Sequence, residues 1–327
     1  MGARPGIESG IVARRLYALI REHRHLPLPG SGETIERFRV LAQVAQEDLS
    51  LAKLFESHAD ALAILSELGE AERIADGSRW AVWCAELQSH RLAFRPDGSG
   101  FVRIVGSKAF ASGFVLLTHA LVSGFGPEGE RLLAAIDLRD PSLTPISGGF
   151  YSAGMSSTET VDLHFDGVRG TLIGGDAAYL KRPGFTHGAA GVAACWYGGA
   201  RALMRFAHEI ANRRGGPHLN AHLAALDLAL EAAANSLRAA AAAIDEHPED
   251  PSQLEVMRAR LMTEAAAEAI LQRLPRMAGA GMLCRDLSLD RILNDLRIYI
   301  RQSHAERDLE AHGLTLSQLE EEALWSL

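Results

Sequence analysis

The chain has 327 residues, of which 47% are hydrophobic and 23% charged, a composition typical of a globular protein with a large core. Its formal net charge of -8 argues against non-specific binding to nucleic acid. The cysteines Cys84, Cys195 and Cys284 are far apart and form no CxxC pair, which argues against a disulfide framework. We find no signal-peptide pattern and no stretch of the ~18 apolar residues that a membrane span needs, so we expect a cytoplasmic protein.

Residues 1–78 predict a short helical domain. Apolar residues at spacings of three and four indicate a helix over residues 8–22 and two more that begin after Ser31 and Asp48, the expected N-caps. The apolar stripe of the third helix contains His58, which we interpret as a packed core histidine rather than a functional one.

Residues 79–182 predict a β domain. Short apolar runs are separated here by Gly, Pro, Asp or Ser, and no helical pattern intervenes, which favours a barrel or sandwich over a parallel sheet. The expected strands are RWAVWCAE, GFVRIVGSKAFASG, LTHALVSGF, RLLAAIDL and TVDLHFDGV. Asp97-Gly98 predicts a hairpin turn. In the last run Asp162 and His164 alternate with apolar residues, so we expect both on the solvent face.

Residues 183–327 predict a bundle of long antiparallel helices joined by short links. The first helix ends before Gly215 and has a face of small residues that allows close helix approach: Gly188, Gly191, Ala194, Gly198 and Ala202. We expect further helices over about 219–246, from an Asp250 N-cap to about Leu274, and across the polar-rich segment 290–310, with a break in MAGAGMLC.

Two motifs are considered and set aside. The glycines of MAGAGMLC follow no strand, so they are not a dinucleotide-binding fingerprint. His218 and His222 have the i, i+4 spacing of two metal ligands on a helix, but no third ligand accompanies them. We therefore predict no metal site.

The order of these regions resembles the acyl-CoA dehydrogenase family, and several local strings agree. GSKAFASG resembles the family's GxKxWITNG segment, which implies that Phe110, Ala111 and Ser112 lie against a flavin. AVWCAE falls where the family has its first flavin-contacting loop, which implies the same for Trp83, Cys84 and Ala85. GMSSTETVDLHFDGV, the first bundle helix and RMAGAGMLCRDLSLDRILNDLR also resemble family segments.

The last of these strings implies that Gly279 and Gly281 help to bind the cofactor, which in this family is FAD. Arg213 stands near the family's ArgxxPheGly segment and is expected at the FAD pyrophosphate, although the Phe is missing here.

The family's usual catalytic glutamate is not at its expected place, where Ser303 stands. Removal of an α-proton from an acyl thioester requires a carboxylate within reach. Glu306 lies about one turn further along if the helix continues, so we name Ser303 and Glu306 as the catalytic candidates. Other branches of the family place the glutamate elsewhere in the bundle, and spacing does not choose among Glu209, Glu231, Glu264 and Glu268.

The resemblance implies a mainly α, α+β fold: a short N-terminal helical domain, a middle β-barrel or sandwich domain and a C-terminal four-helix bundle. It implies an FAD-dependent oxidoreductase that dehydrogenates an acyl thioester, passes electrons to an acceptor flavoprotein and forms a homodimer or homotetramer. Two alternatives stay open. One is a flavin-dependent monooxygenase of the same fold, because such relatives also lack the glutamate. The other is a non-catalytic assembly protein.

Overall fold

The structure is a computed structural model that describes residues 5–98, 101–320 and 324–325. Its contacts divide the chain into two compact units. The first, here called the barrel unit, is Met1–Leu26 with Ser50–Phe185, and the second, the bundle unit, is Pro27–Leu49 with Thr186–Leu327. The helices expected in one N-terminal domain are thus shared between the two units, and the three-domain division at 78 and 182 stays a prediction.

The barrel unit contains the whole sheet. Its helices are α1 (Pro5–Glu22), α3 (Leu49–Glu67), η1 (Ala71–Arg73), η2 (Ser156–Thr158) and α4 (Ala178–Lys181). Its strands are β1 (Trp80–Trp83), β2 (Leu92–Pro96), β3 (Phe101–Ala111), β4 (His119–Phe125), β5 (Arg131–Asp137), β6 (Leu143–Ile146) and β7 (Val161–Leu172).

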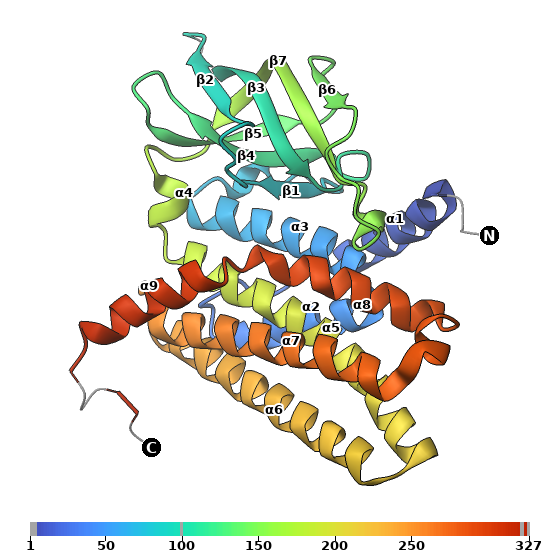
Figure 1. The fold of residues 1–327 in the computed structure, drawn as a ribbon. Coiled ribbons are helices and arrows are strands. Elements are labelled where there is room, and N and C mark those ends of the chain that lie inside the picture. The colour runs from blue at the N-terminus through green and yellow to red at the C-terminus, as the bar shows by residue number, and fades with distance from the viewer. Residues whose placement is uncertain (1–4, 99–100, 321–323, 326–327) are drawn as a thin grey trace. The chain divides into compact units, whose positions relative to one another are not determined.

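Five of these strands close into a ring (Figure 1): β4 pairs with β2, β2 with β3, β3 with β7, β7 with β5, and β5 with β4. β1 adds to β4 in parallel and β6 adds to β7 antiparallel. The predicted β domain is therefore a barrel. The antiparallel pairing of β2 with β3 confirms the hairpin at Asp97-Gly98, where Gly98 has φ 77°.

Helix α3 packs on this barrel and supplies part of its core. Ala61, Ile64 and Leu65 of α3 form one buried cluster with residues of four segments of the β region: Trp80, Leu121, Leu133 and Ile173. The Trp80 N–H donates to Nδ1 of His58 over 3.1 Å, and the Val82 N–H donates to Oγ of Ser57 over 2.8 Å. The helix therefore satisfies backbone groups of the edge strand β1. His58 is 5% exposed, which confirms that it is a packed core histidine.

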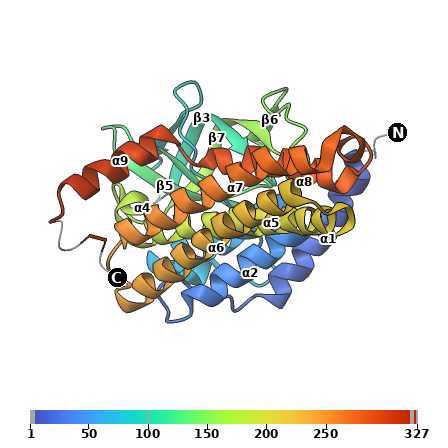
Figure 2. The same ribbon diagram turned by 60° about the horizontal axis from the view of Figure 1, so that its bottom comes forward.

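The bundle unit consists of helices that lie side by side in both Figure 1 and Figure 2. They are α2 (Thr34–Glu47), α5 (Gly184–Arg214), α6 (Pro217–Glu246), α7 (Gln253–Leu283), α8 (Leu287–Tyr299), η3 (Ile300–Gln302) and α9 (Glu306–Ser317). Helices α5 to α8 correspond to the predicted four-helix bundle: α6 and α8 pack on α7, and α5 contacts α7 through hydrogen bonds such as that from Arg260 to Ala189. Helix α2 packs on α6 and α9 on α7. Among the described helices, none has the length and apolarity that crossing a membrane would require.

The small-residue face of α5 allows α2 to approach closely. A Cβ atom on Gly198 would lie 2.2 Å from the carbonyl oxygen of Ala42 and 2.7 Å from Cβ of Ala45. Gly191 lies on the same face, where an added Cβ would be 3.3 Å from Leu41. The expectation of close helix approach at this face is confirmed.

Two of the expected helix N-caps are wrong. The Ser31 hydroxyl donates to the carbonyl of Leu28, and α2 begins at Thr34 without a side-chain cap of its own. Its start is held instead by Asp245 of α6, which accepts hydrogen bonds from the Gly32 and Thr34 N–H groups and from the Thr34 hydroxyl. Asp250 stabilises the turn before α7, because its Oδ1 accepts the Ser252 N–H over 2.7 Å. That helix begins only at Gln253.

The expected break in MAGAGMLC is confirmed, and it lies at Gly279. α7 runs through to Leu283, and Gly279 has the non-helical angles φ 72° and ψ 164°. Glycine adopts this region without steric cost, so the helix changes direction here and resumes.

Candidate functional site

In the barrel unit, Phe110 is exposed on a bulge of β3. The pairing of β3 with β7 shifts register between Lys108 and Ala111, so Phe110 is left out of the ladder. Phe110 has φ 59°, and its side chain is 45% exposed. Ala111 beside it is buried and pairs with Val161. A left-handed backbone is unfavourable for an aromatic residue, and such strain often marks a functional position.

Asp162 of β7 supports this bulge. Its Oδ1 accepts the Phe110 N–H over 3.1 Å, and its Oδ2 lies 3.5 Å from Nε2 of His90. Asp162 is only 9% exposed, so the expectation that it lies on the solvent face is wrong. The alternation of β7 fails here because the bulge turns a backbone N–H of β3 toward the carboxylate.

Three hydroxyl groups continue the surface from Phe110. Oγ of Ser112 lies 2.8 Å from Oγ1 of Thr160, which lies 2.7 Å from Oγ1 of Thr158. The indole of Trp83 is buried and donates to the carbonyl of Ser112 over 3.0 Å. The side chain of Trp83 therefore holds the segment that contains Ser112.

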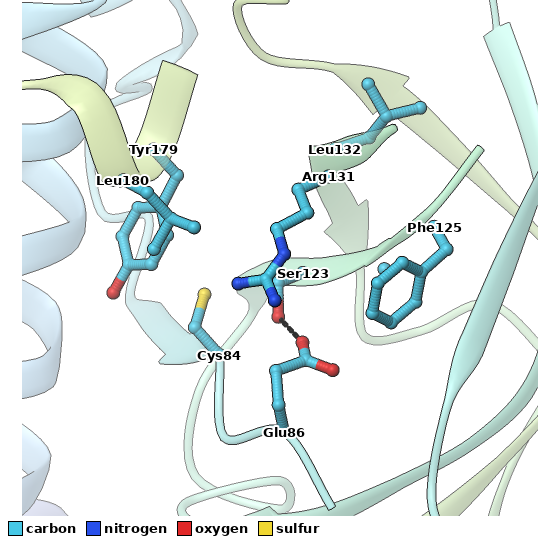
Figure 3. Close-up of a pocket in the computed structure, with 9 residues that line it drawn as sticks. Cys84, Glu86, Ser123, Phe125, Arg131, Leu132, Tyr179 and Leu180 are labelled. Carbon is cyan, nitrogen blue, oxygen red and sulfur yellow. Dashed lines mark hydrogen bonds between the residues drawn. The ribbon is translucent and has the colours of Figure 1, made fainter. Parts of the chain in front are cut away.

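Cys84 follows β1 and lines a cavity of about 40 Å³ (Figure 3). The cavity also involves Glu86, Ser123 and Tyr179. Burial raises the pKa of the Cys84 thiol, against the opposing charge of Lys108, and keeps the thiol protonated. Ala85 is the next residue and is exposed.

A buried lysine fixes the loop that contains Cys84 and Ala85. Lys108 is fully buried, and its Nζ donates to Oε1 of Glu86 over 3.1 Å and to both the carbonyl and the hydroxyl of Ser123. The Ser123 hydroxyl also donates to Glu86. Because a buried ammonium group needs a charged partner and filled hydrogen bonds, this cluster ties the loop after β1 to strands β3 and β4.

In the bundle unit, Ser303 is hydrogen-bonded to a buried carboxylate. Its hydroxyl donates to Oε2 of Glu264 on α7, and both residues are 7% exposed. Arg301 donates to Oε1 of Glu264 over 3.0 Å and to Oε1 of Glu268 over 2.8 Å. Two of the four open base candidates therefore share one guanidinium, and Glu264 also bonds the serine at the expected base position.

A second arginine lies beside this cluster. Arg260 donates to the carbonyl of Ala189 over 2.8 Å, and its guanidinium lies 4.9 Å from the ring centroid of Trp196. Burial lowers the pKa of Arg260, while the charges of Asp308 and Glu264 act in the opposite direction. The negative charge of Glu264 is therefore compensated by two guanidinium groups, those of Arg260 and Arg301.

The helix does not continue from Ser303 to Glu306, and this expectation is corrected. It ends at Gln302, Ser303 is extended, and Ala305 has φ 47° and ψ -113° before α9 begins at Glu306. The Ser303 hydroxyl accepts the Ala305 N–H over 3.2 Å, which fixes this break. Glu306 is exposed at the first position of α9.

The remaining expected residues lie elsewhere in the bundle unit. Arg213 is paired with Glu209 over 2.8 Å, and its side chain is 75% exposed. Its neighbour Arg214 donates to the carbonyls of Met277 and Ala278, directly before the kink at Gly279. Gly281 has no atom within 4 Å of an added Cβ.

The last base candidate, Glu231, and one of the two histidines, His222, each have an arginine partner. Glu231 is ion-paired with Arg238 over 3.2 Å and is exposed. Nδ1 of His222 lies 3.3 Å from a nitrogen of Arg273. Among the described residues, no group of three or more side chains is arranged to hold a metal ion.

Only some of the expected site residues come together, and these form two local sets, one in each unit. The barrel unit brings together the segments around Trp83 and Phe110–Ser112, and the bundle unit brings Ser303 to Glu264. Asp162, Lys108 and Arg301 are functional candidates that the sequence did not single out. Each of them is identified by a partner that lies far away in the sequence. Local residue spacing cannot reveal such a partner.

The barrel-unit residues fit a planar heteroaromatic ring such as that of a flavin. An exposed phenyl group offers a face for stacking, and the neighbouring Ser112 hydroxyl can bond to polar atoms on the rim of a ring. A binding surface for a cofactor commonly combines apolar area with a few placed polar groups. The donor set therefore agrees with the cofactor class that the resemblance implies.

Comparisons with known proteins support the same fold. Residues 178–300 match the family model described as acyl-CoA dehydrogenase, C-terminal domain. The comparison with curated proteins gives no match. Butyryl-CoA dehydrogenase from Megasphaera elsdenii superposes with a TM-score of 0.80 at 16% identity, over 96% of this chain and 90% of that chain.

Two other similar structures are named with FMN. TdsC from Paenibacillus sp. A11-2, a dibenzothiophene monooxygenase solved with FMN and indole, has a TM-score of 0.76 at 17% identity, over 95% of this chain and 96% of that chain. KijD3, solved with FMN and a dTDP-linked amino sugar, has a TM-score of 0.75 at 20% identity, over 94% of this chain and 92% of that chain. The chain thus has the acyl-CoA dehydrogenase fold, and its residues 178–300 match the acyl-CoA dehydrogenase C-terminal domain.

Proposed function

We propose that this protein is a flavin-dependent oxidoreductase that uses reduced flavin and oxygen to oxidise a small organic substrate. The choice of reaction rests on the hydrogen bonds of Glu264, the carboxylate beside Ser303. Oε2 of Glu264 accepts the Ser303 hydroxyl and Oε1 accepts Arg301, so both oxygens are already engaged inside the protein. The Glu264 carboxylate is also only 7% exposed, so a substrate carbon would have to displace Ser303 or Arg301 to lose a proton to it directly.

Bound flavin supplies the redox chemistry, as a hydride acceptor or, when reduced, as the partner of oxygen. The residues of this chain would do the rest. Phe110 and Ser112 would hold the ring, and Lys108 and Glu86 would fix the loop beside it. None of these roles requires a free catalytic carboxylate, which suits an oxygen-dependent reaction. The monooxygenase TdsC is a similar structure by name.

Dehydrogenation of an acyl thioester is the second candidate, and one observation favours it. Glu264 is a buried carboxylate one hydrogen bond away from the serine at the expected base position. A proton taken by the Ser303 oxygen would be matched by transfer of the hydroxyl proton to Glu264. In this reaction Glu264, rather than Glu306, would be the base. Electrons would then leave for an acceptor flavoprotein.

FAD is the cofactor that the family resemblance predicts, and FMN is the alternative that the two FMN-bound similar structures suggest. The ion pair of Arg213 with Glu209 would have to open for Arg213 to reach a pyrophosphate. We therefore propose flavin as the class of cofactor. Chromatography of the cofactor released by heat distinguishes FMN from FAD. A homodimer or homotetramer is proposed from the resemblance, and light scattering on the eluting protein measures it.

The reactions are separated by mixing flavin-loaded protein with saturated acyl-CoAs of several chain lengths without oxygen. We expect no bleaching of the flavin, because the carboxylate beside Ser303 is buried and already hydrogen-bonded within the protein. With reduced flavin, ¹⁸O₂ and indole as a probe substrate, we expect ¹⁸O in the product. Anaerobic bleaching with formation of an enoyl-CoA would contradict the oxygen-dependent reaction and support the second candidate.

If bleaching occurs, substitutions of the candidate glutamates identify the residue that removes the α-proton. Glu264→Gln should then abolish it and Glu306→Gln should leave it, because Glu306 is exposed beyond a break in the helix. The reverse result would make Glu306 the base. A protein that binds no flavin in either redox state would favour the assembly role.

A further inference from the structure

The buried carboxylate of Asp162 is an unusual feature of the barrel. Its neighbours on β7 follow the expected pattern, with Leu163 buried and His164 exposed. Asp162 is nearly as buried as the apolar residues around it. Room for it is made by Gly149, where an added Cβ would lie 2.4 Å from Oδ2 of Asp162. A buried carboxylate is costly unless its oxygens are bonded, so its partners explain why it is there.

The first partner is the strained backbone of Phe110. The left-handed conformation removes the Phe110 N–H from the β3–β7 ladder, and Oδ1 of Asp162 accepts this N–H over 3.1 Å. A hydrogen bond to a charged carboxylate is stronger than one between neutral groups. Asp162 thus stabilises a conformation that phenylalanine otherwise avoids, and that conformation presents the ring to solvent.

The second partner is the loop between β1 and β2. Oδ2 of Asp162 lies 3.5 Å from Nε2 of His90, which belongs to that loop. The other end of the same loop is held by the Glu86–Lys108 pair. Asp162 therefore contacts the bulge at Phe110 and, through His90, the far end of the loop that begins at the expected flavin-contacting residue Cys84.

We propose that Asp162 is the positioning residue of the flavin-facing surface of the barrel unit. It holds the Phe110 ring in the exposed orientation and fixes the position of the adjacent loop. FMN or FAD would then bind to a preformed surface. A preformed surface binds more tightly because less ordering remains to be done on binding. This inference rests on the proposed flavin function, but it concerns a residue that makes no contact with the flavin.

A double-mutant cycle tests it with FMN and FAD as probes, in the oxidised and the dithionite-reduced forms. The variants are Asp162→Ala, Phe110→Leu, their combination and Asp162→Asn, whose amide oxygen can still accept the Phe110 N–H. Dissociation constants come from quenching of flavin fluorescence for the oxidised forms and from absorbance difference titration for the reduced forms. We expect Asp162→Ala to weaken binding about tenfold or more, the scale of one charge-assisted hydrogen bond.

The decisive result is the coupling free energy between Asp162 and Phe110, which shows whether the two residues act together on flavin binding. Because Asp162 acts through the Phe110 ring and also through the adjacent loop, Asp162→Ala should weaken binding clearly less in the Phe110→Leu background than in the wild type, and Asp162→Asn should restore most of the affinity. Equal weakening by Asp162→Ala in both backgrounds would overturn the inference, because it would show a general structural role. Unchanged binding by Asp162→Ala would also overturn it.

A measurement without flavin separates this inference from the proposed function. Hydrogen exchange at the Phe110 amide, followed by mass spectrometry, should be faster in Asp162→Ala than in the wild type and near normal in Asp162→Asn. Melting temperatures of all variants identify any that fail to fold. If the wild type binds neither flavin, both proposals fail. If it binds and Asp162→Ala behaves as the wild type in exchange and affinity, only this inference fails.

Discussion

Glu56 is a carboxyl group buried in α3, and it links pH to stability. Burial raises its pKa to about 7, with Asp60 adding to the rise and Lys53 opposing it. Because the folded value lies above the ordinary 4.5, the folded protein holds this proton more tightly than the unfolded chain. Its contribution to stability is complete below about pH 4.5 and is lost as the pH rises through 7.

We therefore expect the free energy of unfolding to fall by roughly 2–3 kcal/mol between pH 5 and 8, since one pKa unit corresponds to about 1.4 kcal/mol. Glu56→Gln should flatten this dependence and should be more stable than the wild type at pH 8. Urea titrations at several pH values measure it. Glu128→Gln, at an exposed turn, is the matched control and should keep the wild-type slope. The same slope in Glu56→Gln would show that another group titrates.

At the scale of residues, sequence could identify types but not partners. The resemblance places Ser303 at the expected base position and leaves Glu264 as one of four candidates. Only the fold shows that the two are bonded. Strand alternation predicts Asp162 on the solvent face because it ignores bulges, and the bulge at Phe110 is set by pairing with a strand about 50 residues away in the sequence.

At the scale of elements, the packing of α5 on α2 depends on Gly198. The space for a side chain is occupied by the backbone of Ala42, which cannot move without shifting α2. Gly198→Val should lower the free energy of unfolding by ~2 kcal/mol or more, as expected for overpacking against backbone. Thermal or urea unfolding measures this.

Gly313→Ala in α9 is the control for that variant. An added Cβ there has no atom within 4 Å, so alanine should be neutral or should stabilise the helix by up to ~1 kcal/mol. Equal stability of Gly198→Val and the wild type would mean that the close contact between α5 and α2 is absent in solution.

Most of the long helices and the main strands follow from periodicity, but several of their ends do not. α2 is capped by Asp245, a residue of another helix, so no local signal marks its start. The helix expected over 290–310 is broken because the Ser303 hydroxyl bonds the backbone of Ala305. Such tertiary contacts override local propensity, and a sequence read in short windows misses them.

At the scale of the whole molecule, the order of helical, β and helical regions was enough to predict the fold. What the order could not predict is the closure of the barrel through β4 and β5, or the sharing of the N-terminal helices between two units. Both depend on contacts between distant segments. The proposed flavin function rests on the barrel-unit surface around Phe110 and on the Ser303–Glu264 pair, and each is built from several elements.

The most direct test of the account is a titration of the purified protein with FMN and FAD, each oxidised and dithionite-reduced. We predict saturable binding near one flavin per chain to at least one of these forms, and weaker binding by Phe110→Leu because the stacking face is lost. No saturable binding of any of the four forms would contradict the account.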